Sequence, residues 1–121
     1  MASQSNVLLL LLLGVMAVAV SAGQMYTAGG AKGWDVGINY GTMDVDLGDS
    51  VEFNFLKGAH NLVKVDLNGY QSCYDNPSDK NPVWTSGTVI TFNEAVASYY
   101  ICTFAGHCDA GMKVIVNVRK P

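Results

Sequence analysis

The sequence predicts an all-β domain, a Greek-key sandwich or barrel, and three observations favour that fold class. Short runs of β-branched and aromatic residues recur along the chain, as in residues 89–92. Apolar and polar residues alternate over residues 51–55, which is typical of a half-buried strand. After residue 22 no window keeps a helical period, and turn residues separate the runs. We therefore expect short antiparallel strands joined by Greek-key connections.

The expected elements follow these runs in chain order. Strands are predicted at residues 25–27, 43–47, 51–55, 62–65, 89–92, 99–102 and 114–118. Turn signals lie between them at Gly29-Gly30, Asn68-Gly69, Asn76-Pro77, Asn81-Pro82 and Ser86-Gly87. We expect an irregular loop at residues 75–81 and a single helical turn at residues 93–97.

The N-terminus has the pattern of a secretory signal peptide. An apolar run fills residues 7–20, and the small residues Ser21 and Ala22 follow it. The run is shorter than the roughly 20 residues that a membrane-spanning helix needs. We therefore predict a signal peptide at residues 1–22, cleavage near Ala22 and a mature domain at residues 23–121. Such a protein would be secreted and extracellular.

Charge and composition exclude several classes of partner. The formal net charge is −3, with no basic patch of the kind that binds nucleic acid. The chain ends at Arg119-Lys120-Pro121 without a second hydrophobic segment, so we expect no membrane anchor. We expect a soluble monomer.

The most informative motif is Cys-x4-His-x4-Met, formed by Cys102, His107 and Met112. A thiolate, imidazoles and a weak axial thioether are the ligands of blue electron-transfer copper sites. Such a site needs a second imidazole, and the only other histidine is His60. We predict that these four residues bind one copper ion. Considered singly, each has an ordinary alternative: a buried structural cysteine, a turn histidine or a methionine that fills the core.

The predicted strands explain how these residues could meet. Cys102 would end one strand, His107 would lie in the following loop, and Met112 would enter the last strand. His60 would come from a different hairpin, brought close by packing. We expect Asn61, which follows His60, to hydrogen-bond across to the loop that carries the other ligands.

The number of cysteines is odd, so at most two of the three can pair within the chain. Three pairings are open: Cys73–Cys102, Cys73–Cys108 and Cys102–Cys108. If Cys102 is the metal thiolate, only Cys73–Cys108 remains, worth about 4 kcal/mol by chain entropy. The alternative is one disulfide and an inert buried thiol.

At this point the chain resembles the phytocyanins, the small blue copper proteins of plants. The resemblance covers nearly all of residues 25–118. It rests on Tyr26-Thr27, Gly33-Trp34, Gly48-Asp49, Val51-Glu52-Phe53, Gly58-Ala59-His60-Asn61, Tyr70-Gln71-Ser72-Cys73, Tyr100-Ile101-Cys102, Gly106-His107-Cys108 and Gly111-Met112.

The resemblance implies a cupredoxin-like Greek-key fold, a type 1 copper and a Cys73–Cys108 disulfide. It also implies His60, Cys102, His107 and Met112 as the copper ligands. Methionine at position 112 and the absence of a Pro/Ser-rich tail are most similar to plantacyanins, the basic blue proteins. One departure is the sequence pI of about 5.0, because plantacyanins are typically basic.

The predicted function is electron transfer through a Cu(II)/Cu(I) couple, without enzymatic activity of its own. The redox partner, a protein or a small-molecule reductant, is not identified by the sequence. Small residues around His107 suggest that electrons pass there. The alternatives are an extracellular signalling or chemotropic protein of plant reproduction with a structural copper, and copper buffering.

Overall fold

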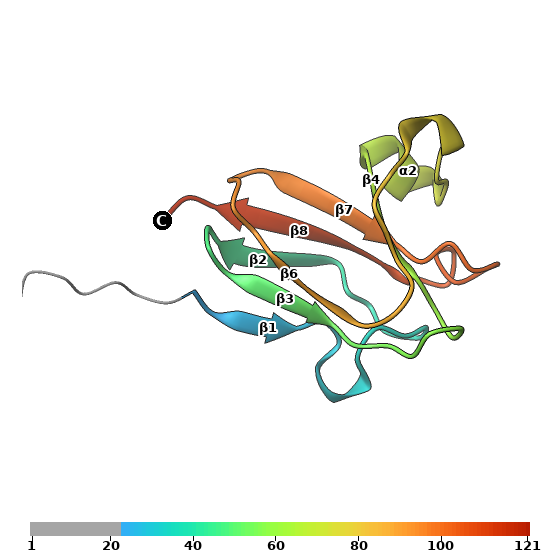
Figure 1. Ribbon diagram of the computed structural model, residues 1–121, viewed down its shortest axis with the longest axis horizontal. Coiled ribbons are helices and arrows are strands. Elements are labelled where there is room, and N and C mark those ends of the chain that lie inside the picture. The colour runs from blue at the N-terminus through green and yellow to red at the C-terminus, as the bar shows by residue number, and fades with distance from the viewer. Residues whose placement is uncertain (1–22) are drawn as a thin grey trace, which may run out of the picture.

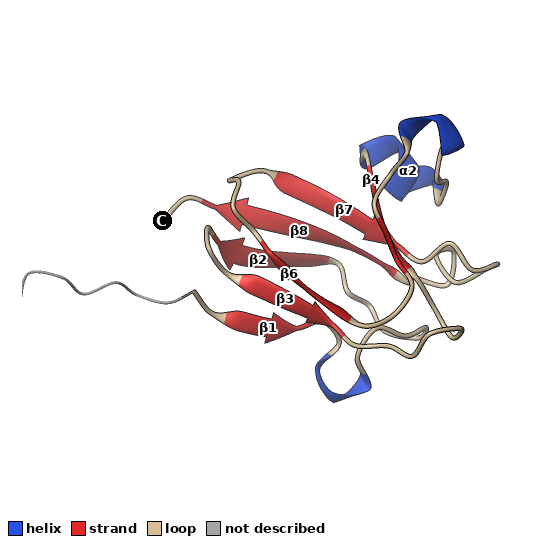
Figure 2. Ribbon diagram, viewed as in Figure 1, coloured by secondary structure: helices blue, strands red, loops and turns tan. Residues whose placement is uncertain are grey.

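The computed structural model describes residues 23–121 and builds them into two β-sheets (Figures 1 and 2). The predicted signal peptide lies outside the described residues. The strands are β1 (Met25–Thr27), β2 (Thr42–Asp46), β3 (Ser50–Phe53), β4 (Leu62–Val65), β5 (Val83–Trp84), β6 (Thr88–Thr91), β7 (Ala97–Ile101) and β8 (Lys113–Arg119).

The two sheets confirm the predicted all-β sandwich and correct one detail of it. The smaller sheet has the order β1-β3-β6, and the larger has the order β2-β8-β7-β4-β5. Not all pairs are antiparallel, because β1 pairs parallel with β3 and β2 pairs parallel with β8. The physical reason is the path of the chain, since β2 of the larger sheet intervenes between β1 and β3. Strands that pair in one sheet are then not consecutive in the chain, and such strands can run parallel because no tight hairpin joins them.

The core lies between the sheets and follows the alternation of the strands. In β8, Val114, Val116 and Val118 are buried while the residues between them are partly exposed. In β3, Val51 and Phe53 are buried in the same way. Successive side chains of a strand point to opposite faces of the sheet, so in β3 and β8 every second side chain enters the core.

Two elements were missed by the sequence analysis. Strand β5 has only two residues, too few for a recognisable pattern. Helix α2 (Leu67–Ser72) contains the Asn68-Gly69 pair that predicted a turn. Asp66 caps this helix, since its carboxylate accepts a hydrogen bond from the Gly69 N–H at 2.7 Å.

Short 3-10 turns occupy two of the loops, η1 (Gly30–Lys32) and η2 (Pro77–Asp79). The second lies in the loop predicted at residues 75–81. The helical turn predicted at residues 93–97 is wrong, because Ala97 already belongs to β7 and the residues before it form bends.

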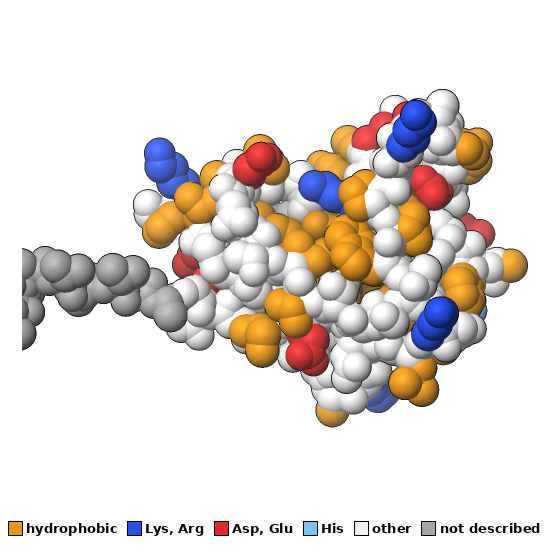
Figure 3. Space-filling view, viewed as in Figure 1, with side chains coloured by type: hydrophobic (Ala, Val, Ile, Leu, Met, Phe, Trp, Pro, Cys, Tyr) orange, Lys and Arg blue, Asp and Glu red, His pale blue; other side chains and the backbone are white. Residues whose placement is uncertain are grey.

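The loops β3–β4 and β7–β8 meet at the end of the sandwich opposite the C-terminus (Figure 1). The segment between β1 and β2 reaches the same end. On the face shown in Figure 3, charged side chains of both signs are dispersed and apolar side chains show between them. Within residues 23–121, no helix has the length and apolar character to cross a membrane.

Candidate metal centre

Three side chains with metal-binding atoms converge at this end of the sandwich. Cys102 follows the last residue of β7, His107 lies in the loop to β8, and His60 lies in the loop between β3 and β4. One ligand atom from each lies within 4.8 Å of the other two. The structure therefore brings together the thiol and both imidazoles that the sequence singled out.

The histidine rings approach through the same type of nitrogen. Nδ1 of His60 lies 3.1 Å from Nδ1 of His107, and Nδ1 of His107 lies 3.5 Å from Sγ of Cys102. At 3.1 Å the two Nδ1 atoms are close enough to share one proton, and which ring donates depends on the tautomers. A cation between the rings would take the place of that proton.

Met112 is linked to Cys102 and His107 by backbone hydrogen bonds and lies in the same core cluster as Cys102. The Cys102 N–H donates to the Met112 carbonyl at 3.1 Å, and the Met112 N–H donates to the His107 carbonyl at 3.0 Å. The Met112 and Cys102 side chains are fully buried in the same core cluster. The methionine is thus tied at both backbone groups to the two ligand candidates that precede it.

Exposure differs among these residues. Cys102 is fully buried, whereas His107 is half-buried and lies beside exposed Ala105, Gly106 and Ala110. The His60 side chain keeps 12% of its surface exposed. A thiolate shielded from water and an imidazole near the surface suit a site that must hold charge inside and exchange electrons outside.

Asn61 links the loop of His60 to the loop of Cys102 and His107. Its Nδ2 donates to Thr103 Oγ1 at 2.7 Å, and its Oδ1 accepts from the Thr103 N–H at 2.8 Å. Thr103 follows Cys102 directly. Both functional groups of the amide are therefore used to join the His60 loop to the Cys102 loop, the contact expected of Asn61.

A third segment, residues 33–40, supports His60. The sequence analysis used Gly33-Trp34 for the family resemblance but predicted no role for this segment at the site. The buried Trp34 donates its indole N–H to the Asn61 carbonyl at 2.8 Å. Next to it, Asp35 Oδ1 lies 3.2 Å from His60 Nε2. Tyr40 closes the segment by donating to the Gly33 carbonyl at 2.6 Å. Burial, above all, raises the pKa of the Tyr40 hydroxyl, which stays neutral.

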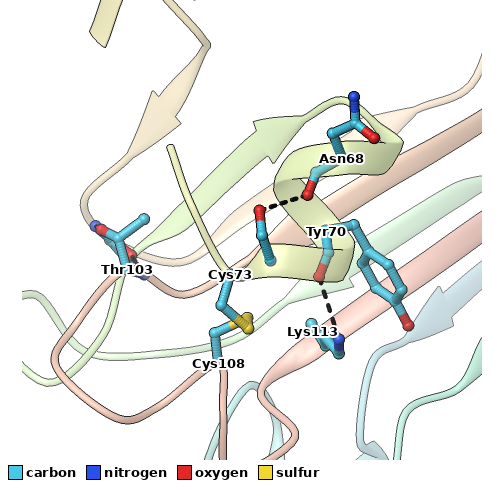
Figure 4. Close-up of a disulfide and its surroundings, with 8 residues drawn as sticks. Asn68, Tyr70, Cys73, Thr103, Cys108 and Lys113 are labelled. Atoms are coloured by element: carbon cyan, nitrogen blue, oxygen red, sulfur yellow. Dashed lines mark hydrogen bonds between the residues drawn. A yellow bond between two sulfur atoms is a disulfide. The ribbon is translucent and has the colours of Figure 1, made fainter. Parts of the chain in front are cut away.

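The predicted disulfide joins Cys73 to Cys108 (Figure 4). Cys73 caps the C-terminus of α2, and Cys108 is the residue after His107. Lys113 strengthens the same junction, since its ammonium donates to the Tyr70 carbonyl at 3.1 Å and lies 4.4 Å from the Tyr70 ring centroid. The remaining cysteine, Cys102, carries a free thiol.

The donor set fits copper. Two imidazoles and one thiol converge, and a buried methionine follows on the same loop. Copper in blue sites takes this combination, whereas calcium and magnesium prefer oxygen ligands. A hydrogen bond between the Cys102 thiol and His107 Nδ1 would be weak. Such a bond contributes little to the stability of the fold, so metal binding explains better why the thiol and the two imidazoles lie together.

Comparison with known proteins gives the same result. The family model described as a plastocyanin-like domain matches residues 34–112, more than half of the chain. The chain belongs to the phytocyanin family of blue copper proteins. A blue copper protein of Pisum sativum is 34% identical over 124 residues, which cover 98% of this chain and 65% of that relative. The phytocyanin described here thus spans less than two thirds of the pea relative's length.

Two further relatives match over nearly their whole length. A basic blue protein of Cucumis sativus is 35% identical over 95 residues, covering 77% of this chain and 97% of the relative. The solved structure of the cucumber basic protein, a blue copper protein, has 32% identity and a TM-score of 0.65. That match covers 78% of this chain and 98% of the cucumber protein. Cucumber stellacyanin has a TM-score of 0.68 at 25% identity, covering 84% and 99%.

These findings confirm the predicted family, the cupredoxin fold, the disulfide and the copper cofactor. Family membership and the donor set of this phytocyanin support a single type 1 copper site and the predicted role in electron transfer. The assignment of individual residues as ligands stays a prediction.

Proposed function

We propose that His60, Cys102, His107 and Met112 ligate the copper of this phytocyanin and that electrons pass through His107. The observation that carries the proposal is that one nitrogen of each imidazole and the Cys102 Sγ lie within 4.8 Å of one another. The two Nδ1 atoms are 3.1 Å apart. When bound, copper supplies a one-electron Cu(II)/Cu(I) couple whose potential depends on the axial ligand and the surroundings of the sulfur.

The chain's own residues give this site its rigidity. Cys102 directly follows β7, and its N–H donates to the carbonyl of Met112, the residue before β8. The loop between them is closed by turns, in which the Ala110 N–H donates to the His107 carbonyl and the Gly111 N–H to the Cys108 carbonyl. A site held in this way moves little when its charge changes, so little reorganisation opposes electron transfer.

The half-buried His107 supports the proposed route. Its neighbours Ala105, Gly106 and Ala110 are small and exposed, so a partner can approach the ring closely. We propose a redox protein or a small-molecule reductant as that partner. We further propose that the mature chain is secreted, monomeric and without enzymatic activity of its own. The phytocyanin relatives are blue copper proteins, which supports these proposals.

The decisive experiment adds Cu(II) to the purified mature domain and records the visible spectrum, the EPR spectrum and the reduction potential. We expect an intense blue colour with reversible cycling, and its loss in Cys102→Ser. A colourless wild-type protein would refute the proposal. For the axial position, Met112→Gln should change the potential, whereas the control Met43→Leu, at a partly buried core position, should not.

A second candidate is the signalling role considered from the sequence. The similarity to a Chemocyanin of Lilium longiflorum favours it, at 32% identity over 100 residues, covering 81% of this chain and 78% of that relative. A biological activity that survives Cys102→Ser would support signalling with a structural copper. An activity lost together with the blue colour would support the electron carrier.

A further inference from the structure

The contact between Asp35 and His60 points to a role that the sequence pattern did not suggest. We propose that Asp35 is a positioning residue that fixes the ring of His60 through its outer nitrogen and favours Cu(II) over Cu(I). The proposal rests on the proposed function, because it takes His60 as a copper ligand. Its basis is the 3.2 Å distance between Asp35 Oδ1 and His60 Nε2.

Hydrogen bonds hold the backbone around Asp35 in place. The Asp35 N–H donates to the Tyr40 hydroxyl at 2.8 Å, and that hydroxyl donates to the Gly33 carbonyl. The Val36 N–H donates to Asp35 Oδ1 at 2.7 Å, which orients the carboxylate. The indole of Trp34 bonds to the residue after His60. These hydrogen bonds therefore place the Asp35 carboxylate next to the His60 imidazole.

This contact selects one tautomer of His60. A carboxylate accepts hydrogen bonds, so the proton of a neutral His60 lies on Nε2, facing Asp35. Nδ1 then carries the lone pair, and Nδ1 is the atom that faces His107 and Cys102. That is the tautomer a metal ligand needs, and carboxylates on the outer nitrogen of ligand histidines commonly fix it. The proton between the two Nδ1 atoms then belongs to His107.

The charge of Asp35 acts in the same direction. A negative charge on the outer nitrogen makes the imidazole a stronger donor, and it interacts more strongly with Cu(II) than with Cu(I). Asp35 is about half exposed, so solvent and salt reduce this effect. The ordinary alternative is a surface ion pair with a protonated histidine, which would contribute little. The two explanations differ in where the His60 proton lies.

The test uses two variants and a matched control on the mature chain. Asp35→Asn keeps an oxygen that can accept from Nε2 but removes the charge, whereas Asp35→Ala removes both. Asp109→Asn is the control, because Asp109 is an exposed carboxylate in the loop of Cys102 and His107. The first readout is the histidine tautomer in the metal-free protein, from long-range proton–nitrogen NMR. The second is the affinity for Cu(I) and Cu(II), with the reduction potential.

We expect His60 of the metal-free wild type to be protonated on Nε2 and to become a tautomer mixture in Asp35→Ala only. In Asp35→Ala the affinity for Cu(II) should fall about tenfold or more. A tenfold greater loss for Cu(II) than for Cu(I) corresponds to a rise of about 59 mV in potential. Asp35→Asn should keep the tautomer and show a smaller rise, and Asp109→Asn should match the wild type.

Two results would overturn the proposal. One is a His60 proton on Nδ1 in the wild type, and the other is the same shift of potential in Asp109→Asn as in Asp35→Asn. A wild-type chain that binds no copper would refute the proposed function instead, while the tautomer measurement would still judge the role of Asp35.

Discussion

The two sides of the metal centre are held by different means. The loop between β7 and β8 carries Cys102, His107 and Met112 within a short stretch of chain, closed by backbone turns and by the disulfide at Cys108. The His60 side has no covalent link. It depends on hydrogen bonds from Trp34 and Asn61 and on the contact with Asp35.

This difference separates two tasks. The covalent side fixes the spacing of proposed ligands that are already close in sequence, so it adds mainly stability. The polar side brings in a proposed ligand from a distant part of the chain and sets its orientation, so small changes there should alter metal binding more than the stability of the fold. The following predictions test that division, beginning with the largest expected effect on stability.

Removing the disulfide should cause the largest loss. The variant Cys73→Ala/Cys108→Ala is expected to lose about 4 kcal/mol of unfolding free energy, because the unfolded chain regains the freedom of a long closed loop. Urea denaturation of the metal-free protein measures this. If the loss were below about 1 kcal/mol, the backbone turns alone would hold the covalent side.

A substitution at the end of the sandwich opposite the metal centre serves as a control, because it should lower stability without changing copper binding. The buried Asp49 accepts hydrogen bonds from the Gln24 and Asp46 N–H groups at 2.7 and 2.8 Å, in the turn between β2 and β3. Asp49→Ala leaves both donors unpaired and should cost about 3 kcal/mol. Copper affinity of the folded fraction should equal that of the wild type. A change in it would show that the two ends of the sandwich are coupled.

Asn61→Ala should have a smaller effect on stability and a larger one on the metal. It breaks both hydrogen bonds to Thr103, and we expect a loss of about 2 kcal/mol because these groups are partly exposed. The copper spectrum should broaden or shift, since His60 loses its tie to the Cys102 loop. An unchanged spectrum together with the stability loss would mean that Asn61 serves only the fold.

The smallest effect is expected at the cap of α2. Asp66→Ala removes the acceptor of the Gly69 N–H and should cost about 1 kcal/mol, as helix caps generally do. Helix α2 ends at Cys73, so the variant tests whether an ordered helix matters to the covalent side once the disulfide exists. Denaturation under oxidising and reducing conditions measures the loss of unfolding free energy with and without the Cys73–Cys108 disulfide. A loss much larger than about 1 kcal/mol with the disulfide intact would contradict the prediction that this cap has the smallest effect.

The sequence predicted the covalent side better than the polar side. Cys102, His107 and Met112 share one short segment whose spacing is itself informative. His60 was reached only because the chain holds no other candidate imidazole. Asp35 and Trp34 were not found as supports of His60, since neither their spacing nor their type relates them to it before folding. An aspartate next to a tryptophan could contact many different residues after folding, so the pair alone does not indicate His60.

The fold shows the same limit. Strands such as β3 and β8 alternate over enough residues to be recognised, whereas β5 has two residues and α2 has six. The parallel pairs arose from the order in which the chain visits the two sheets. No local pattern records that order.

The burial of Cys102 also decides which thiols become oxidised. Cys102 and Cys108 are six positions apart, whereas Cys73 and Cys108 are separated by 35. In an unfolded chain the shorter loop closes more easily, by roughly 1.6 kcal/mol from the length dependence of loop entropy. That pairing would consume the thiol that we propose as a copper ligand. We therefore expect chains oxidised before folding to contain Cys102–Cys108, and chains oxidised after β7 and β8 have formed to contain Cys73–Cys108, because folding hides Cys102. Mass mapping of the disulfides would distinguish the two products.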